Sequence, residues 1–247
     1  MNSCHGPMIS LRKERALSVP MALLFAYALG GSFMVPGAAW AGAIKGAVRF
    51  TGPPIERMML PVTADQYVCG KEKESEALML SAIKGIRNAV VSLRNPPVGA
   101  KWPGSVPRVQ IDQKQCVYVP HVILVPVGGT VEFLNGDRLL HNLHSMSIEN
   151  RSFNRTQPTG RTIPIVFTKA EIVRVDCDLH PWMRTWVVVA KHPFYVITDE
   201  RGEFMLDNVP AGKYTLQVWQ ENLGSMTQDV AVNDEGVTTL TVEMGPK

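Results

Sequence analysis

The feature that most constrains the fold of this sequence is a succession of short, valine-rich segments in which apolar and polar residues alternate. A period of two is typical of strands with one buried face, and no long stretch has the 3.6-residue period of a helix. Glycine, proline, asparagine and aspartate separate the segments and supply turns. The clearest segments are 90–93, 122–125, 131–134, 173–177, 186–189 and 214–218. The pattern predicts an all-β protein with two sandwiches.

Composition supports a globular protein. The chain has 247 residues, of which 45% are hydrophobic and 19% charged, enough apolar material for a sizeable core and too much for a disordered chain. The net charge of +3 is small and dispersed. We therefore expect no nucleic acid among the partners, because nucleic-acid binding needs a concentrated basic surface.

The N-terminus has the pattern of a secretory signal. It carries a basic cluster of Arg12, Lys13 and Arg15. An uncharged stretch follows over residues 16–44, with small residues flanking Trp40 in the Ala-Trp-Ala sequence of a cleavage site. The pattern predicts a signal peptide over 1–41 and a periplasmic protein with no membrane span after cleavage. The alternative is an uncleaved anchor, since the stretch is long enough to cross a bilayer.

Cleavage would remove Cys4, three basic residues and one acidic residue, which leaves a net charge of +1. The remaining cysteines are Cys69, Cys116 and Cys177. Disulfides form in an oxidising compartment, but three cysteines cannot all pair within one chain. Either one thiol is free or one cysteine has a different task.

A metal-binding pattern surrounds the last of these cysteines. Cys177, His180 and Met183 have the spacing C-x2-H-x2-M directly after a predicted strand. The upstream segment 135–144 contains two further histidines, His141 and His144. One Cys, one Met and two His form the ligand set of a blue copper site, in which a trigonal His2Cys plane has a weak axial Met.

Other readings use the same residues. Zinc would suit Cys177 and two imidazoles, but a thioether is not a usual zinc ligand. A Cys/His nucleophile pair would need an orienting group that the sequence does not show. Cys177 and Met183 are alternatively plain core residues. We do not expect an enzyme, because a site with four protein ligands has no open position for substrate.

Because odd offsets along a strand point to opposite faces, His144 and His141 should not reach one metal.

Residues 119–190 resemble the cupredoxin family, and within it the amicyanins. The resemblance rests on the short C-x2-H-P-aromatic-M loop, on the N-x5-H-N pattern that starts at Asn135, and on the closing run of valines. In the family the histidine directly before the asparagine is a ligand. The resemblance therefore implies one type 1 copper bound by His141, Cys177, His180 and Met183. It also implies that Asn142 forms a hydrogen bond across to the ligand loop.

The function that this resemblance implies is the transfer of single electrons. The partner would be a redox protein such as a periplasmic dehydrogenase or a c-type cytochrome, in a methylamine-utilisation setting, and the carrier would be a monomer. We expect the edge of His180 to be the exposed electron port, with Pro181 and Trp182 as an apolar docking patch. The alternative is a non-redox copper-binding protein or a carbohydrate-binding-like module. With Cys177 assigned to copper, Cys69 and Cys116 remain and are predicted to form a disulfide.

The flanking segments resemble a second family. The TDxxGxF sequence of 198–204 and the VPxGxYxL sequence of 209–216 resemble carboxypeptidase regulatory-like domains, which are small transthyretin-like sandwiches. The domain's usual first strands would lie far upstream. We therefore expect this sandwich to be split into 44–95 and 193–245, with the cupredoxin domain at 96–192 between the halves. Alternatively, 44–95 adds edge strands to the cupredoxin. The charged run at 71–76 is expected to be a solvated loop.

Overall fold

The computed structural model describes residues 41–234 and 236–246. The predicted signal peptide, including Cys4, lies outside these residues except for Ala41. The protein is all-β, as the alternation of apolar and polar residues predicts, and its strands are joined by turns and one four-residue helix. In the part of the chain that the structure describes, no helix is long and apolar enough to cross a membrane.

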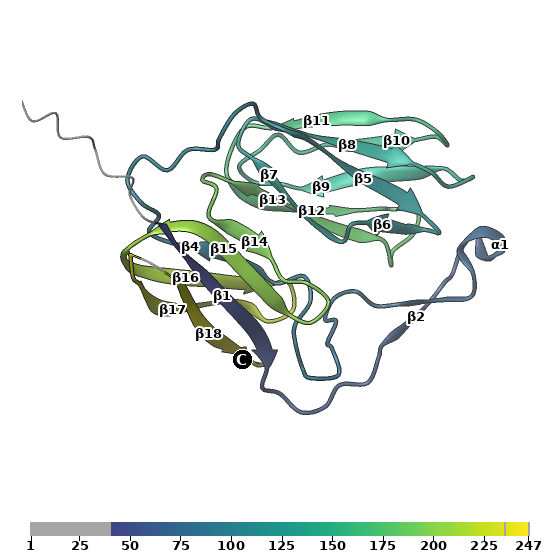
Figure 1. The fold of residues 1–247 in the computed structure, drawn as a ribbon. Coiled ribbons are helices and arrows are strands. Elements are labelled where there is room, and N and C mark those ends of the chain that lie inside the picture. The colour runs from purple at the N-terminus through teal and green to yellow at the C-terminus, as the bar shows by residue number, and fades with distance from the viewer. Residues whose placement is uncertain (1–40, 235, 247) are drawn as a thin grey trace, which may run out of the picture. The chain divides into compact units, whose positions relative to one another are not determined.

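The first sandwich has a five-stranded and a four-stranded sheet (Figure 1). The five-stranded sheet has the order β10-β9-β12-β13-β7, with β7 (Val122–Pro126), β9 (His141–Met146), β10 (Asn154–Gln157), β12 (Glu171–Asp176) and β13 (Arg184–Ala190). The other has the order β11-β8-β5-β6, with β5 (Arg108–Lys114), β6 (Val117–Val119), β8 (Gly129–Asn135) and β11 (Ile163–Phe167). The core between them includes Ile111, Tyr118, Phe133, Leu143 and Val175.

Antiparallel pairing in the five-stranded sheet determines where the metal-binding pattern meets. Strand β12 runs antiparallel to β9, with Asp176 opposite His144. The first residues of β9 therefore lie at the same end of the sheet as the last residues of β12. This register brings His141, which begins β9, beside Cys177, which follows β12.

The second sandwich combines strands from both ends of the described chain. One sheet has the order β15-β1-β18, with β1 (Ala41–Phe50), β15 (Glu203–Pro210) and β18 (Val237–Met244). The other has the order β14-β4-β16-β17, with β4 (Val90–Leu93), β14 (Tyr195–Ile197), β16 (Gly212–Gln220) and β17 (Gly224–Val232). Val48 and Val91 share one core with Leu216 and Val218. Strands on either side of the first sandwich in sequence thus enclose a common core.

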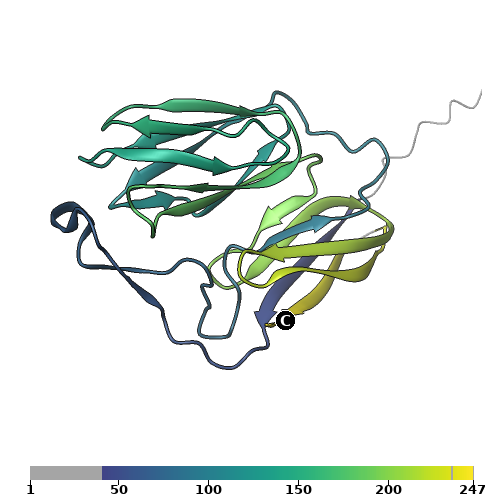
Figure 2. The same ribbon diagram turned by 180° about the vertical axis from the view of Figure 1, so that it is seen from behind.

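Between β1 and β4 the chain forms an arm that reaches the first sandwich (Figures 1 and 2). It contains β2 (Met59–Pro61), α1 (Gln66–Cys69) and β3 (Glu72–Glu74), and β2 pairs with β3. The expectation of a solvated loop at 71–76 is wrong in part, because backbone pairing with β2 orders its central residues. We call residues 62–70, at the end of this arm, the cap.

The sandwiches contact one another through apolar side chains and one buried ion pair. Val90, Val122 and Val188 form a small cluster, and the rings of Trp186 and Trp219 meet edge to face with centroids 5.0 Å apart. Beside them, His121 contacts the Glu221 carboxylate through Nε2, and both side chains are almost fully buried.

Both ring nitrogens of His121 face acceptors. Nδ1 lies 3.1 Å from the carbonyl oxygen of Arg184 and 3.5 Å from Oε2 of Glu76. Burial lowers the pKa of His121, but its hydrogen bonds to Glu221 and Glu76 outweigh burial and raise the pKa to about 9. An imidazolium, which donates from both nitrogens, therefore satisfies this site at neutral pH.

Replacing His121 with glutamine should remove a pH-dependent part of the stability. Because the folded-state pKa is raised from 6.5 to about 9, the imidazolium stabilises the fold fully below the unfolded-state value, and this contribution is lost as the pH rises through the folded-state value. The shift corresponds to a free energy on the order of 3 kcal/mol. Urea unfolding of the metal-free protein at about pH 6 and about pH 10 should show that the stability gap between wild type and His121→Gln narrows at the higher pH.

A matched control is Glu132→Gln, which breaks the exposed Arg108–Glu132 pair. It should change the unfolding free energy little, because exposed ion pairs contribute little. A gap between wild type and His121→Gln that stays the same at both pH values would contradict the role given to His121.

Candidate metal centre

Three donor atoms of the predicted ligand set converge in the first sandwich. Nδ1 of His141 lies 2.9 Å from Nδ1 of His180, and Sγ of Cys177 lies 3.6 Å from His180 Nδ1 and 4.0 Å from His141 Nδ1. The point equidistant from three atoms so placed lies inside their triangle, about 2.1 Å from each, close to the length of a transition-metal bond to imidazole nitrogen. All three side chains are buried. The arrangement thus has the size and shape of a trigonal metal site.

Carboxylates hold the outer nitrogens of both imidazoles. Nε2 of His141 lies 3.0 Å from Oδ2 of Asp137, and Nε2 of His180 lies 3.1 Å from Oδ2 of Asp65. An imidazole that donates from Nε2 to a carboxylate keeps a lone pair on Nδ1. Two such lone pairs facing each other across 2.9 Å repel unless a cation or a proton lies between them. The donor set therefore fits a metal ion.

The surroundings of Cys177 disfavour an uncompensated charge. Burial raises the pKa of the Cys177 thiol, although backbone N–H groups of Asn142, Leu179 and His180 donate toward the sulfur and oppose the shift. Burial also lowers the pKa of His141, which the Asp137 carboxylate offsets only in part. A bound cation would instead favour the thiolate form of Cys177, because a coordinating thiol is deprotonated.

Hydrogen bonds fix the ligand loop between β12 and β13. The side-chain oxygen of Asn142 accepts the Asp178 N–H at 2.6 Å, which is the contact across to the loop that the resemblance implies for this residue. Within the loop, Met183 N–H donates to the His180 carbonyl and Cys177 N–H donates to the Met183 carbonyl. The backbone of Met183 is thereby held beside Cys177 and His180, and its side chain is buried. Its role as axial ligand stays a prediction.

His144 lies outside the donor set. Its Nδ1 lies 2.8 Å from the Asp178 carboxylate, and a third of its side chain is exposed. Hydrogen bonds from His144 and Asn154 hold the pKa of Asp178 below its usual value. His144 thus supports the loop from outside through Asp178, on the other face of β9 from His141.

The expected exposure of the His180 edge is wrong. None of the His180 side chain is exposed, because the cap covers its outer edge and supplies Asp65 as a hydrogen-bond partner. The expected docking patch is also less exposed than predicted. Pro181 is exposed, but Trp182 is half-buried, packs against His180 with ring centroids 5.2 Å apart, and donates from Nε1 to the Cys116 carbonyl.

The predicted disulfide between Cys69 and Cys116 is confirmed, with a sequence separation of 47 residues. Cys116 also lies close to Asp137 and His141. Since its sulfur is bound to Cys69, it cannot serve there as a thiolate ligand. Cys177 is the free cysteine of the described residues.

The sequence interpretation missed both carboxylates that face the histidines. Asp137 precedes His141 by four residues, and its carboxylate also accepts the backbone N–H groups of Gln115 and Cys116. An acidic residue so near a candidate ligand was a usable local signal. Asp65 lies 115 residues before His180. No local pattern connects those two positions.

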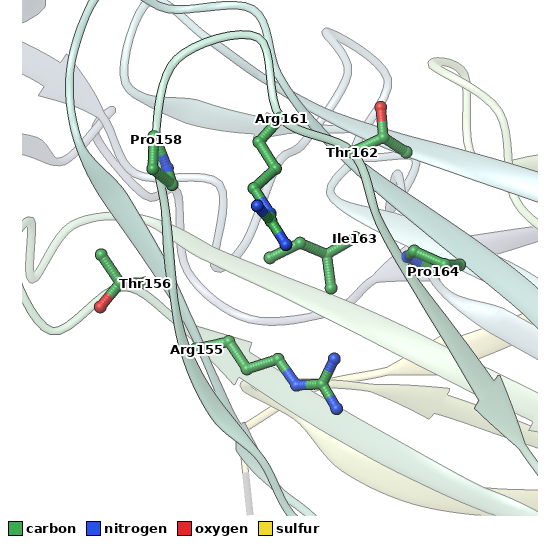
Figure 3. A pocket seen from close by; sticks show the side chains of 7 residues that line it. All are labelled: Arg155, Thr156, Pro158, Arg161, Thr162, Ile163 and Pro164. Carbon is green, nitrogen blue, oxygen red and sulfur yellow. The ribbon is translucent and has the colours of Figure 1, made fainter.

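One hollow of the described surface is separate from the donor set (Figure 3). It has a volume of about 500 Å³ and lies between β10 and β11, where Arg155 and Arg161 extend beside Ile163. No member of the donor set lines it. The candidate metal centre is built from buried side chains.

Comparison with known proteins gives partial matches. A family model described as polysaccharide lyase family 4, domain II, matches residues 182–240. This is a different family from the carboxypeptidase regulatory-like domain expected for the C-terminal strands. The comparison with curated proteins finds no match.

Similar solved structures include cupredoxins and a copper-containing enzyme, at low TM-scores. A copper-containing nitrite reductase from Thermus scotoductus SA-01 is 28% identical over 39% of this chain and 25% of that chain, with a TM-score of 0.33. This chain thus spans about a quarter of that enzyme. A purple cupredoxin from Nitrosopumilus maritimus is 28% identical over 33% of this chain and 99% of that chain (TM-score 0.30). A reduced Cu(I) form of an amicyanin variant is 22% identical over 40% and 98% (TM-score 0.32). These matches give no link to methylamine utilisation.

Thiol titration should find one reactive thiol in a metal-free chain that begins at Gly42 and is unfolded without reductant. Cys177 supplies this thiol, since Cys69 and Cys116 are bonded to each other. Prior reduction should raise the number to three. The variant Cys177→Ala should show none without reductant, and three thiols in the unreduced wild type would contradict the disulfide.

Proposed function

We propose that this chain is a type 1 (blue) copper protein that carries single electrons between redox partners in the periplasm, and that it is not an enzyme. The observation that carries the proposal is the trigonal convergence of His141 Nδ1, His180 Nδ1 and Cys177 Sγ. Copper, when bound, supplies a one-electron couple between Cu(I) and Cu(II). Met183 is the proposed axial ligand, because its soft thioether suits copper better than zinc.

The tasks of the chain's own residues follow from their contacts. His141 and His180 present lone pairs inward, and Cys177 presents sulfur whose charge is stabilised by surrounding backbone N–H groups. Asn142 fixes the position of the ligand loop through Asp178. Ligands held this firmly change position little between two oxidation states. A small rearrangement is what rapid electron transfer requires.

The partner stays part of the proposal. The expected partner is a redox protein such as a periplasmic dehydrogenase or a c-type cytochrome, meeting the monomeric carrier in a small and transient contact. Pro181 is the exposed member of the predicted docking patch. Trp182 packs against His180 and lines a surface hollow together with Pro181.

The burial of His180 favours a second candidate function, the holding of copper without electron transfer. A covered ligand edge suits a storage or delivery protein, since it slows exchange with solvent. Voltammetry separates the two. An electron carrier gives a reversible one-electron wave, whereas a storage protein prefers Cu(I) and shows no reversible couple.

Adding Cu(II) to the purified chain from Gly42 should produce an intense visible absorption band from thiolate-to-copper charge transfer. The variant Cys177→Ala should lose the band, because the thiolate supplies the electron density of the transition. The matched control His144→Ala should keep it, since His144 contacts Asp178 rather than the donors. Loss of the band in the control, or its persistence in Cys177→Ala, would overturn the assignment of the site.

A further inference from the structure

The cap places a carboxylate on the outer edge of His180 from a remote part of the sequence. Oδ2 of Asp65 lies 3.1 Å from Nε2 of His180. The His180 side chain has no exposed surface, whereas the Asp65 side chain is 38% exposed. Asp65 therefore lies between the imidazole and solvent, beside Nε2 rather than beside the Nδ1 that faces His141 and Cys177.

The backbone around Asp65 leaves this carboxylate free for His180. Asp65 stands directly before α1 with a φ of 52°, in the left-handed region that aspartate tolerates. Aspartate at this position usually accepts a hydrogen bond from the first turn of the helix. Here the side chain makes no such bond, and the Asp65 carbonyl accepts the N–H groups of Val68 and Cys69 instead.

Several contacts anchor the cap to the first sandwich. Val62 and Cys69 are buried in the same core as Cys177. The disulfide joins Cys69 to Cys116, whose carbonyl accepts the indole N–H of Trp182 at 3.0 Å. The cap is thus connected through Cys116 to the ligand loop itself, as well as through Asp65.

We propose that the cap closes the metal site and that Asp65 is a positioning residue for His180, so that metal enters and leaves only when the cap opens. The proposal rests on the copper-binding function proposed above. The contact on Nε2 fixes the tautomer and the ring orientation that aim Nδ1 at the metal. The cap meanwhile excludes water and external ligands from the one imidazole that lies on the ligand loop.

The test compares copper release from wild type and from Asp65 variants to an excess of the Cu(I) chelator bicinchoninate. Because residues that orient metal ligands contribute about 10- to 100-fold to metal affinity, Asp65→Ala should bind Cu(I) more weakly by about that factor and release it to the chelator faster than wild type. Asp65→Asn should be intermediate, since its amide oxygen still accepts a hydrogen bond from Nε2. The control Glu72→Gln removes an exposed carboxylate from the same arm and should release copper at the wild-type rate.

A second measurement needs no copper. In NMR spectra of the metal-free wild type, the Nε2–H of His180 should be visible and protected from exchange with water, and Asp65→Ala should lose this signal. Absence of the signal in wild type, or equal release rates for wild type and Asp65→Ala, would overturn the proposed role of Asp65.

The two proposals fail in different ways. If Cu(II) gives no blue band in any variant but the His180 signal depends on Asp65, the copper function is wrong and the contact stands. If the band forms in all Asp65 variants with unchanged release rates, the copper function stands and the cap does not control access.

Discussion

The candidate metal centre depends on the opposed orientation of two imidazoles. His141 and His180 each donate outward to a carboxylate, so their inner nitrogens face each other 2.9 Å apart. In a buried site, two lone pairs at this distance are unfavourable unless a positive charge lies between them. The third donor, Cys177, is more readily a thiolate beside a cation than alone in the core. The facing nitrogens and the buried sulfur are therefore unfavourable without a positive charge between them, and the arrangement favours binding of a cation.

Sheet register makes this geometry possible. His141 begins β9 and Cys177 follows β12, and their antiparallel pairing places both at one end of the five-stranded sheet. The loop from Cys177 to Met183 is held by its own backbone hydrogen bonds and by Asn142 from the neighbouring strand. The ligands thus lie at the end of a sheet or on a loop that hydrogen bonds hold in place, which limits their movement.

Much of this arrangement was predictable because its determinants are local. Alternating burial along β8 and β16 follows the period of two in the sequence, and it indicates the all-β class without reference to tertiary contacts. The C-x2-H-x2-M spacing identifies a loop whose donors must be close together. The pairing of Cys69 with Cys116 followed once Cys177 had another task, and the structure confirms that pairing.

The features that could not be predicted depend on contacts between distant segments. Whether the edge of His180 is exposed depends on the arm between β1 and β4. The predicted disulfide of Cys69 ties this arm to Cys116, but nothing in the sequence indicates that Asp65 then reaches His180. His121 shows the same limit. In its apolar segment it looks like an ordinary core histidine, and its contacts with Glu221, 100 residues away, and with Glu76 raise its pKa.

The cap alters what such a site can do. An open ligand edge allows short electron paths to a partner, but it also allows water and competing ligands to reach the metal. In the proposed carrier, covering His180 limits both, and an electron would leave through packed side chains such as Trp182, whose ring packs against His180. Because Trp182 also donates to the carbonyl of Cys116, the disulfide that anchors the cap and the indole beside the ligand form one connected unit. The disulfide and the hydrogen bond of Trp182 therefore connect the cap over His180 with the indole beside it.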